Sequence, residues 1–367
     1  MKRVATNLML VMVALGLAFG LAEILVRLLM ADTTVLFPRY HTDYRYGEYH
    51  LRGIRPNEKF MHSSIDGQWE FVTNSAGFRN DRDFAYDKPP DVLRILVLGD
   101  SHTQGYEVRQ EATYAEVLRR SLSSETRKVE VLNAGVSGFG TAEELAFLEN
   151  EGYRYHPDVV VLGFFGNDYE DNLKAGLFAL DPNGRLIPKK YEHIPGVKIQ
   201  NVIYAIPGVK WLGEHSHFYS LLFNTAWVYY KYFLPGPDGE APRALPEYAV
   251  PTKQHQSEGE IALAASLIER MQQFCNLRHI RLIVVDIPTD LDRYRIESSL
   301  PLALRDRLKA SRVEIVSSES LFQPYANAVD IHLPHGYHHI SEFSHALIGV
   351  ELGRRIGDTG KAGPGDR

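Results

Sequence analysis

The chain has 367 residues, 44% of them hydrophobic, so it can bury the core of one large domain or two smaller ones. Its formal net charge of -6 and the lack of a run of Lys and Arg argue against a nucleic acid as the partner. A single cysteine, Cys275, excludes an internal disulfide framework and a multi-cysteine metal site, and its helical surroundings predict a buried apolar residue.

The first segment, residues 1–31, has the composition of a membrane span. Lys2 and Arg3 precede an uncharged apolar run, and the stretch up to Met30 reaches the roughly 20 residues that cross a bilayer. We expect an uncleaved transmembrane anchor, with the rest of the chain outside the cytoplasm, in the periplasm or at the cell surface. A cleaved signal peptide and a buried core helix are the alternatives. Glu23 and Arg27, four residues apart, are expected to pair.

Three further segments follow the anchor. Residues 32–90 are rich in Tyr, Arg, Asn, Gly and Asp, and the alternating stretch QWEFVTN predicts edge strands or a hairpin in an extracytoplasmic accessory segment. Residues 91–357 carry the strand and helix patterns of the main domain. Residues 358–367 are expected to form a flexible tail.

The main domain alternates strands with helices. Three runs of Val, Leu and Ile each end in glycine and polar residues, as strands buried on both faces of a parallel sheet do: RILVLGDS, KVEVLNAG and DVVVLGFFGND. Two later runs, IRLIVVDIP and VEIVSS, have the same character. One helix between the strands is expected to open with Thr141 and Glu144 as a capping box. The alternation predicts a doubly wound α/β sheet.

A long insertion, at about residues 169–252, interrupts this alternation after the third strand. It contains the aromatic stretch FYSLLFNTAWVYYKYFLPG. An insertion of this kind usually covers the carboxyl ends of the strands, where ligands bind. A helix pair packed on the core is an equally weighted alternative, because aromatic residues at helical spacing are more often core.

The ends of the first three strands carry the groups that acyl transfer needs. The first strand delivers Ser101, the second a glycine-rich turn with Gly135, Gly138 and Gly140, and the third Asn167. In an open α/β sheet these loops meet in one crevice, so a hydroxyl nucleophile would face backbone and amide N–H donors. Asp100 and Asp168 are predicted to brace their own turns rather than to act as acid and base.

A serine nucleophile needs a base, and the stretch DIHLPHGYHHISEFSHALIGVELGRRIG near the carboxyl terminus contains five histidines. His339 stands shortly before Ser341, the expected N-cap of the final helix, and could lie over the crevice. A metal site built from these histidines is a weaker alternative, because the cluster lacks carboxylates at ligand spacing; we expect neither a metal nor another cofactor. His102, next to Ser101, is expected to point away from the base.

The chain resembles the SGNH/GDSL hydrolases over roughly residues 94–356, without the insertion. The likeness lies in the four sequence blocks of that family, which appear here in the same order as GDSH, NAGVSG, GND and a late stretch with HIS and SH. The resemblance implies a flavodoxin-like three-layer α/β/α sandwich. It also implies Ser101 as nucleophile, His339 as base, and an oxyanion hole made of the Ser101 N–H, the Gly138 N–H and the Asn167 side chain. The stretch VTNSAGFRN, together with the anchor, resembles membrane-tethered bacterial members of the family.

One departure from the family pattern concerns the acid of the triad. The family usually carries an aspartate two or three positions before the histidine, and this chain has a tyrosine and a glycine there. We retain His339 as the base, with His338 and His332 as alternatives; Asp330 stands two positions before His332. The orienting group of the triad could be Asp330, a backbone carbonyl, or nothing.

These observations predict an extracytoplasmic serine esterase or acyl transferase that acts on an acylated carbohydrate or another envelope substrate, with O-acetyl as the favoured acyl group. The location and the aromatic insertion favour a sugar, because aromatic faces stack on sugar rings. The rival hypothesis is a catalytically inactive SGNH-like protein that binds glycan or acts as a scaffold in the cell envelope, with the missing acid as the first sign of decay.

Overall fold

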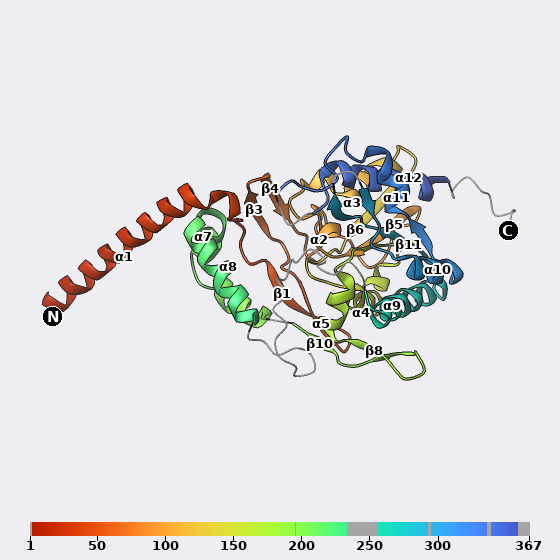
Figure 1. Cartoon of the computed structure of the whole chain (residues 1–367), viewed down its shortest axis with the longest axis horizontal. Helices are drawn as coiled ribbons and strands as arrows, with labels where there is room; N and C mark the ends of the chain where they lie inside the picture. Colours follow the sequence, from red (N-terminus) through yellow and green to blue (C-terminus); the bar gives the residue numbers. More distant parts are fainter. Residues whose placement is uncertain (1, 195, 233–255, 293–294, 336–338, 359–367) are drawn as a thin grey trace.

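The amino-terminal helix α1 (Lys2–Leu29) extends away from the rest of the chain (Figure 1). The structure is a computed structural model that describes residues 2–194, 196–232, 256–292, 295–335 and 339–358. Val26 is the one buried residue of α1, which makes the core-helix alternative wrong. Among the described helices, α1 alone is long and apolar enough to cross a membrane. The expected pair forms, with Arg27 Nε 2.6 Å from Glu23 Oε1.

Two antiparallel hairpins make up most of the accessory segment: β1 (His41–Tyr46) with β2 (Tyr49–Ile54), and β3 (Lys59–Ser64) with β4 (Gly67–Val72). The second hairpin contains the stretch for which alternation predicted strands. Phe60 and Phe71 stack across it with ring centroids 4.9 Å apart, and Tyr40 packs on both rings. These aromatic side chains belong to the same apolar cluster as one face of the main sheet, so the accessory segment packs on the domain.

The main domain is built on five parallel strands in the spatial order β14, β11, β7, β5, β6. Their bounds are β5 (Val92–Gly99), β6 (Lys128–Asn133), β7 (Val159–Phe164), β11 (Arg281–Asp286) and β14 (Glu314–Val316). Counted along the chain this is the order 2-1-3-4-5, which confirms the predicted flavodoxin-like sheet. The order reverses between β5 and β7, and in such sheets the ligand crevice opens at that point.

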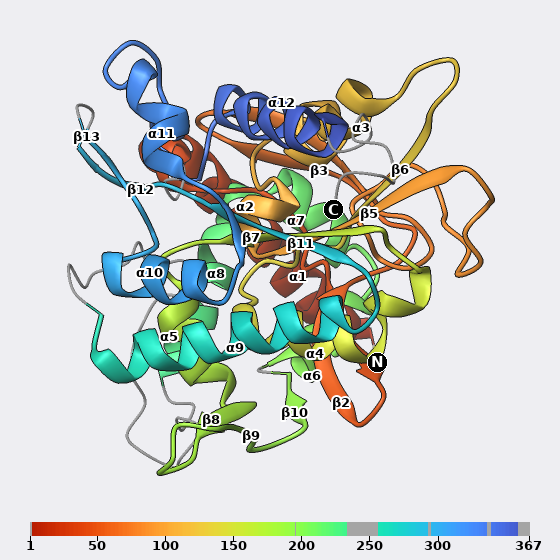
Figure 2. The same ribbon diagram turned by 90° about the vertical axis from the view of Figure 1, so that its right-hand side faces the viewer.

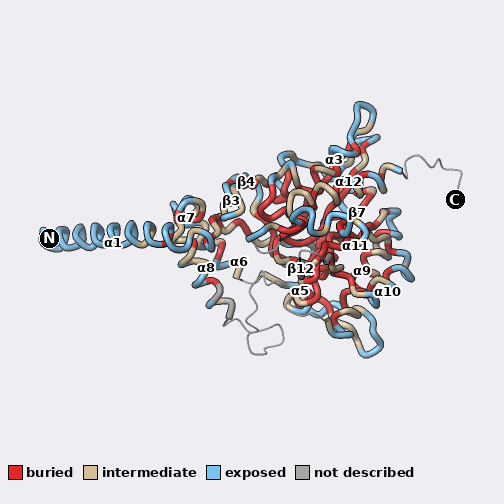
Figure 3. Tube along the Cα trace, turned by 45° about the horizontal axis from the view of Figure 1, so that its top comes forward, coloured by how far each residue is buried: buried red, intermediate tan, exposed pale blue. Residues whose placement is uncertain are grey.

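Helices cover both faces of this sheet (Figure 2). One face packs on α3 and α12, and the other on α4, α5, α9 and α10. The helix bounds are α2 (Ser101–Gln104), α3 (Tyr114–Leu122), α4 (Thr141–Asn150), α5 (Asp168–Ala175), α9 (Glu258–Asn276), α10 (Leu302–Ala310), α11 (Ser318–Phe322) and α12 (Glu342–Asp358). Two apolar clusters, one on each face, complete the three-layer sandwich; Figure 3 shows how burial concentrates there.

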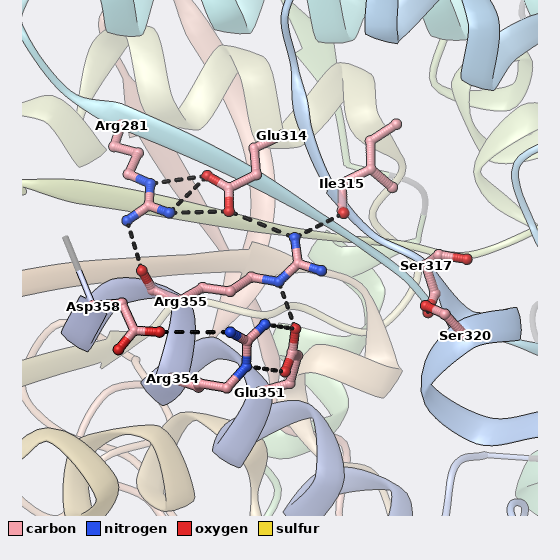
Figure 4. Close-up of polar contacts among 9 residues, drawn as sticks. All are labelled: Arg281, Glu314, Ile315, Ser317, Ser320, Glu351, Arg354, Arg355 and Asp358. Atoms are coloured by element: carbon pink, nitrogen blue, oxygen red, sulfur yellow. Dashed lines mark hydrogen bonds and ion pairs between the residues drawn. The ribbon is translucent and has the colours of Figure 1, made fainter. Parts of the chain in front are cut away.

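The carboxyl-terminal end of α12 is tied to the amino ends of β11 and β14 by a charged network (Figure 4). Arg281 Nε donates to Glu314 Oε2 at 2.9 Å, and Arg355 Nε donates to Glu351 Oε1 at 2.6 Å. Arg355 Nη1 also donates to the carbonyl oxygen of Ile315 at 3.0 Å. These contacts fix the helix whose opposite end follows His339.

The insertion contains α5 and then two short pairings and three helices: β8 (Phe178–Leu180) with β9 (Leu186–Pro188), β10 (Glu192–His193) beside β2, α6 (Val197–Tyr204), α7 (Val209–His215) and α8 (His217–Tyr232). Helix α6 packs on β1, α7 on β3 and α8 on α1. The last three helices therefore lie between the anchor helix and the accessory hairpins, so for them the prediction that they cover the strand ends or the core is wrong (Figure 1). The start of the insertion does pack on the core, because α5 contacts α4 and α9. Residues 233–252, the end of the predicted insertion, lie outside the described residues.

Candidate active site

Ser101 stands in the turn that follows β5, at the start of α2. Asp100 caps this helix, with its Oδ1 accepting a hydrogen bond from the His102 N–H at 2.8 Å, as predicted for a residue that braces the turn. Gly99 has a φ of 150°, and a Cβ there would lie 1.9 Å from Thr103 Oγ1, so the strand needs glycine to turn. The turn holds Ser101 at the carboxyl edge of the sheet.

His339 meets this serine from the far end of the chain. Its Nε2 lies 2.8 Å from Ser101 Oγ. The backbone fixes its position, because the Leu333 N–H donates to the His339 carbonyl and the Ser341 N–H to the Ile331 carbonyl, each at 2.8 Å. A hydroxyl at hydrogen-bond distance from an imidazole nitrogen is the geometry of a base-activated nucleophile.

The other candidates for base and acid lie elsewhere. His332 Nε2 is 2.9 Å from the carbonyl oxygen of Pro288, so the structure brings His339 and not His332 to the serine. His338 and the two preceding positions lie outside the described residues. Asp330 is exposed, and its carbonyl oxygen accepts the Ser341 hydroxyl at 2.7 Å. Its role as the orienting acid stays a prediction.

The prediction that His102 points away from the base is wrong. Its ring lies 4.8 Å from the His339 ring and 4.0 Å from that of Phe165, and its Nδ1 accepts the Ile340 N–H at 3.3 Å. Neighbouring positions diverge in extended backbone, but Ser101 and His102 sit in a helical turn, which turns both toward one loop. Tyr106 packs on the other side of His339, with ring centroids 4.5 Å apart.

Three buried histidines around this pair are held neutral. Burial lowers the pKa of His102 well below its usual range, and it lowers the pKa of His62 and of His345 to about 3. Neutral neighbours leave room for one positive charge, so an imidazolium that forms on His339 would meet no second cationic ring.

The predicted oxyanion turn is clamped on both sides of Gly138. On one side, the Ser137 N–H and hydroxyl both donate to Gln104 Oε1, at 2.8 and 2.6 Å. On the other, Arg52 Nη2 donates to the Gly138 carbonyl oxygen. Gly138 has a φ of 77°, and a Cβ there would lie 2.4 Å from the Arg52 guanidinium, so glycine is required. Arg52 comes from the accessory strand β2 and is 4% exposed.

Asn167 stands before α5, at the end of the third core strand. Its Nδ2 donates to Asp171 Oδ2 at 3.0 Å, and its side chain also hydrogen-bonds the Asp100 carboxyl, so the amide is held beside the nucleophile turn. Ser101 is the first residue of α2, so its N–H has no acceptor within the helix. These two groups and the Gly138 turn come from the loops that sequence reasoning named.

A group of buried carboxylates lies beneath these loops. Burial raises the pKa of Asp100 to about 7 and that of Glu144 and Asp168 well above the usual range. Asp168 accepts the Thr141 hydroxyl at 2.9 Å, so it braces α4 rather than its own turn. The predicted capping box of Thr141 and Glu144 is wrong. Helix α4 begins one residue earlier, where the Gly140 N–H donates to the Glu143 carboxylate at 2.9 Å and glycine offers no side chain to complete a box.

This carboxylate group does not have the geometry of a metal site. Within the part of the chain that the structure describes, no three or more His, Cys, Asp and Glu side chains are arranged to hold a metal ion. Perturbed titratable groups gather at functional sites, and their position under the crevice follows that pattern.

Sequence reasoning missed the contribution of the accessory segment. Arg79, 2% exposed, donates through Nη1 to the Gln104 carbonyl at 2.9 Å and through Nη2 to the Val108 carbonyl at 2.5 Å, and so holds the chain that leaves the nucleophile turn. Asn80 accepts the Asn133 N–H at 2.9 Å at the end of β6. Both residues lie in the VTNSAGFRN stretch. The sequence signal for their role was that this stretch is rich in polar residues but does not have the pattern of an exposed helix.

A comparison with family models finds a match for the part of the chain that carries the predicted nucleophile and oxyanion loops. Residues 97–215 match the model of the GDSL-like Lipase/Acylhydrolase family. This part of the chain is similar to the GDSL-like hydrolases. This likeness is the one that the sequence motifs predicted, and the match spans Ser101, Gly138 and Asn167 but ends before His339.

Several solved structures resemble the chain. They include a two-domain esterase active on acetylated mannans (13% identity, TM-score 0.42, covering 75% of this chain and 52% of that one). Others are a lipase/acylhydrolase from Enterococcus faecalis (16%, 0.40, 75% and 100%) and the acetyl xylan esterase AlAXEase (12%, 0.39, 72% and 100%). This chain thus spans about half of the first structure. At these values the likeness assigns no substrate to this chain. No curated protein matches it.

Proposed function

We propose that the chain is a serine esterase, or a related acyl transferase, whose catalytic domain is held outside the cytoplasm by α1. The observation that carries the proposal is the 2.8 Å contact between Ser101 Oγ and His339 Nε2. These side chains are 238 residues apart in the sequence, and they meet at the edge of the sheet where ligands bind in this fold class.

In the proposed reaction His339 Nε2 takes the proton from Ser101 Oγ as the oxygen attacks the acyl carbon. The negative charge that forms on the carbonyl oxygen is stabilised by the N–H groups of Ser101 and Gly138 and by the Asn167 amide. The proton then passes from His339 to the leaving alcohol, which gives an acyl-serine. Water or a second hydroxyl takes the acyl group in the reverse sequence, and this step divides esterases from transferases.

The orienting acid is the least supported part of the proposed site. We retain Asp330 as the candidate within the described residues, because it lies on the segment that pairs with the His339 loop through Ser341. A serine and histidine without an acid would work more slowly, since the nucleophile and the oxyanion donors remain. Asp330→Asn is expected to reduce turnover far less than a change of Ser101.

For the substrate we propose an acylated carbohydrate or another envelope molecule, with acetyl as the acyl group. Support comes from the placement outside the cytoplasm that the basic amino terminus and α1 predict. The aromatic insertion no longer supports a sugar, because α8 packs on α1 and not at Ser101.

The rival function, an inactive protein that binds glycan or serves as a scaffold, is favoured by one observation. Ser101 is 6% exposed and His339 3% exposed, so other side chains cover both, and Tyr106 packs on the His339 ring. An ester would need this cover to move before it could reach the serine.

The deciding experiment measures hydrolysis of p-nitrophenyl acetate by the full chain in detergent. Ser101→Ala and His339→Ala are each expected to lower kcat by a factor on the order of 10⁴ or more, because neither partner acts without the other. His332→Ala serves as the matched control and should turn over like the parent. Full activity of Ser101→Ala would overturn the mechanism, and a parent chain without activity on any acyl ester would favour the rival. Free acetate, as against acetyl transferred to an added sugar, separates esterase from transferase.

A further inference from the structure

Helix α8 carries an exposed apolar stripe. Leu222 is 57% and Tyr229 64% exposed, and the exposed residues Thr225 and Ala226 lie between them. Phe218 stands four residues before Leu222, so the stripe has the spacing of one helix face. None of these five residues carries a charge.

The start of this helix is attached to α1. The Glu23 carboxylate of α1 accepts hydrogen bonds from the backbone N–H groups of His217 and Phe218, each at 3.0 Å, and from the Ser216 hydroxyl at 2.7 Å. Arg27 Nη2 donates to the His215 carbonyl at 2.6 Å. An acidic side chain at a helix start is favourable because it accepts the free N–H groups and meets the positive end of the helix dipole. The contacts therefore fix where α8 leaves α1.

That point coincides with the expected membrane surface. The uncharged part of α1 runs from Val4 to Ala22, and at about 1.5 Å per residue it is about 28 Å long. The hydrocarbon core of a bilayer is about 30 Å thick, so Glu23 would stand where the core ends. Helix α8 therefore begins at the depth of the lipid headgroups.

The stripe faces the same side as α1. Phe218, its first member, meets Phe19 of α1 edge to face, with ring centroids 5.3 Å apart. The opposite side of α8 faces the protein: Trp227 is buried, and Arg39 lies 4.6 Å over the Phe223 ring. Figures 1 and 3 agree that α8 runs crosswise at the base of α1, between α1 and the accessory hairpins.

We infer that the stripe of α8, from Phe218 to Tyr229, lies in the interfacial layer of the same bilayer that α1 crosses. The partner is a lipid surface, which accepts uncharged apolar side chains and favours tyrosine at the headgroup level. The inference rests on the anchor part of the proposed function. Two attachments, one across the bilayer and one along it, would hold the hydrolase domain at a fixed orientation instead of on a swivelling tether.

The chain offers a clean labelling experiment. Its one cysteine, Cys275, is fully buried, and burial raises the pKa of that thiol to about 12, so a thiol reagent would react at introduced cysteines. The experiment uses three full-length variants: Leu222→Cys, Val13→Cys in α1, and Leu277→Cys. Each is labelled with a fluorophore and placed in lipid nanodiscs that contain nitroxide-bearing lipids. Leu277 is the matched control, because it is a leucine 80% exposed at the end of α9.

We expect the nitroxide lipids to quench the labels at positions 222 and 13 and to leave the label at 277 bright. Quenching at 13 with none at 222 would overturn the inference while leaving the anchor intact. No quenching at 13 would remove both the anchor and the inference. A disulfide-linked dimer of unlabelled Leu222→Cys chains, with a label at 222 that lipids do not quench, would show that a second copy covers the stripe and would overturn the inference too.

Discussion

The two ends of the parallel sheet treat charge in opposite ways. At the amino end Arg281, Glu314 and Arg355 are only partly buried and each has an oppositely charged partner (Figure 4). At the carboxyl end Asp100 and Asp168 are buried, and burial raises the pKa of both. The amino end of the sheet joins elements by ion pairs, whereas the carboxyl end contains buried carboxyl groups that stay protonated up to near neutral pH.

This difference separates structural charge from functional charge. Paired groups near solvent add modestly to stability, and their loss changes little else. Buried groups with displaced pKa values cost stability, so their presence indicates that the carboxyl edge is shaped by something other than stability. Variants at each end can therefore break or sharpen the comparison.

Among the variants that test this comparison, the largest effect is expected at Arg52, which holds the Gly138 turn from the accessory segment. Arg52→Met removes the donor to the Gly138 carbonyl, so the N–H predicted to bind the oxyanion would lose its fixed direction. Loss of one oxyanion donor lowers kcat by about 10²- to 10³-fold, so a misdirected Gly138 N–H should lower kcat by up to that factor. KM should change little. Steady-state kinetics with p-nitrophenyl acetate give both constants.

Two variants show whether Arg52 acts through position. Arg52→Lys keeps one donor and should recover part of kcat, whereas a role in folding alone would not give a recovery confined to kcat. Arg45→Met, an exposed arginine in the partner strand, should behave like the parent. A rise in KM with kcat unchanged would remove Arg52 from the oxyanion turn.

The second effect concerns pH and stability. Burial raises the pKa of Glu107, just beyond the nucleophile turn, from 4.5 to about 7. The folded state therefore binds the extra proton, and stability falls as pH rises between these two values and is level above them. Glu107→Gln removes this loss, which amounts to about 3 kcal/mol at pH 8. Thermal unfolding should show the advantage of the variant growing from pH 4.5 to 7.

Glu351, near the amino end of the sheet, is expected to change stability with pH in the opposite direction to Glu107. Hydrogen bonds from Arg354, and also from Arg355, lower the pKa of Glu351 below 4.5. Its contribution is complete above pH 4.5 and is lost as pH falls through the lowered value. Glu351→Gln should therefore lose stability relative to the parent at neutral pH and approach it in acid. The same pH trend in both glutamine variants would contradict the division between the two ends.

The sequence predicted most of the frame of this site and little of its support. Runs of Val, Leu and Ile ending in glycine predicted the strands, and strand order followed from alternation together with the family resemblance. Ser101, Gly138 and Asn167 lie on predicted loops because each follows a strand directly. Arg52 was missed because its partner is 86 residues away and nothing in YHLRGI marks a buried arginine. The attachment of α8 to Glu23 was missed for the same reason, since apolar composition does not name a partner.

The smallest effect is expected at Arg355, where the comparison predicts a change in stability without a change in chemistry. Arg355 contacts Glu351, Glu314 and Ile315, and its side chain is 24% exposed. Partly exposed pairs contribute about 1 kcal/mol or less, so Arg355→Met should lower the free energy of unfolding by about that amount. Denaturant titration should give an unchanged m-value, and added salt should shrink the difference between variant and parent. Turnover should equal that of the parent, because the ion pairs position the far end of α12 and not the His339 loop itself. A fall in kcat like that expected for Arg52→Met would show that the amino end also positions the catalytic base, and the two ends of the sheet would then have to be treated as one coupled unit.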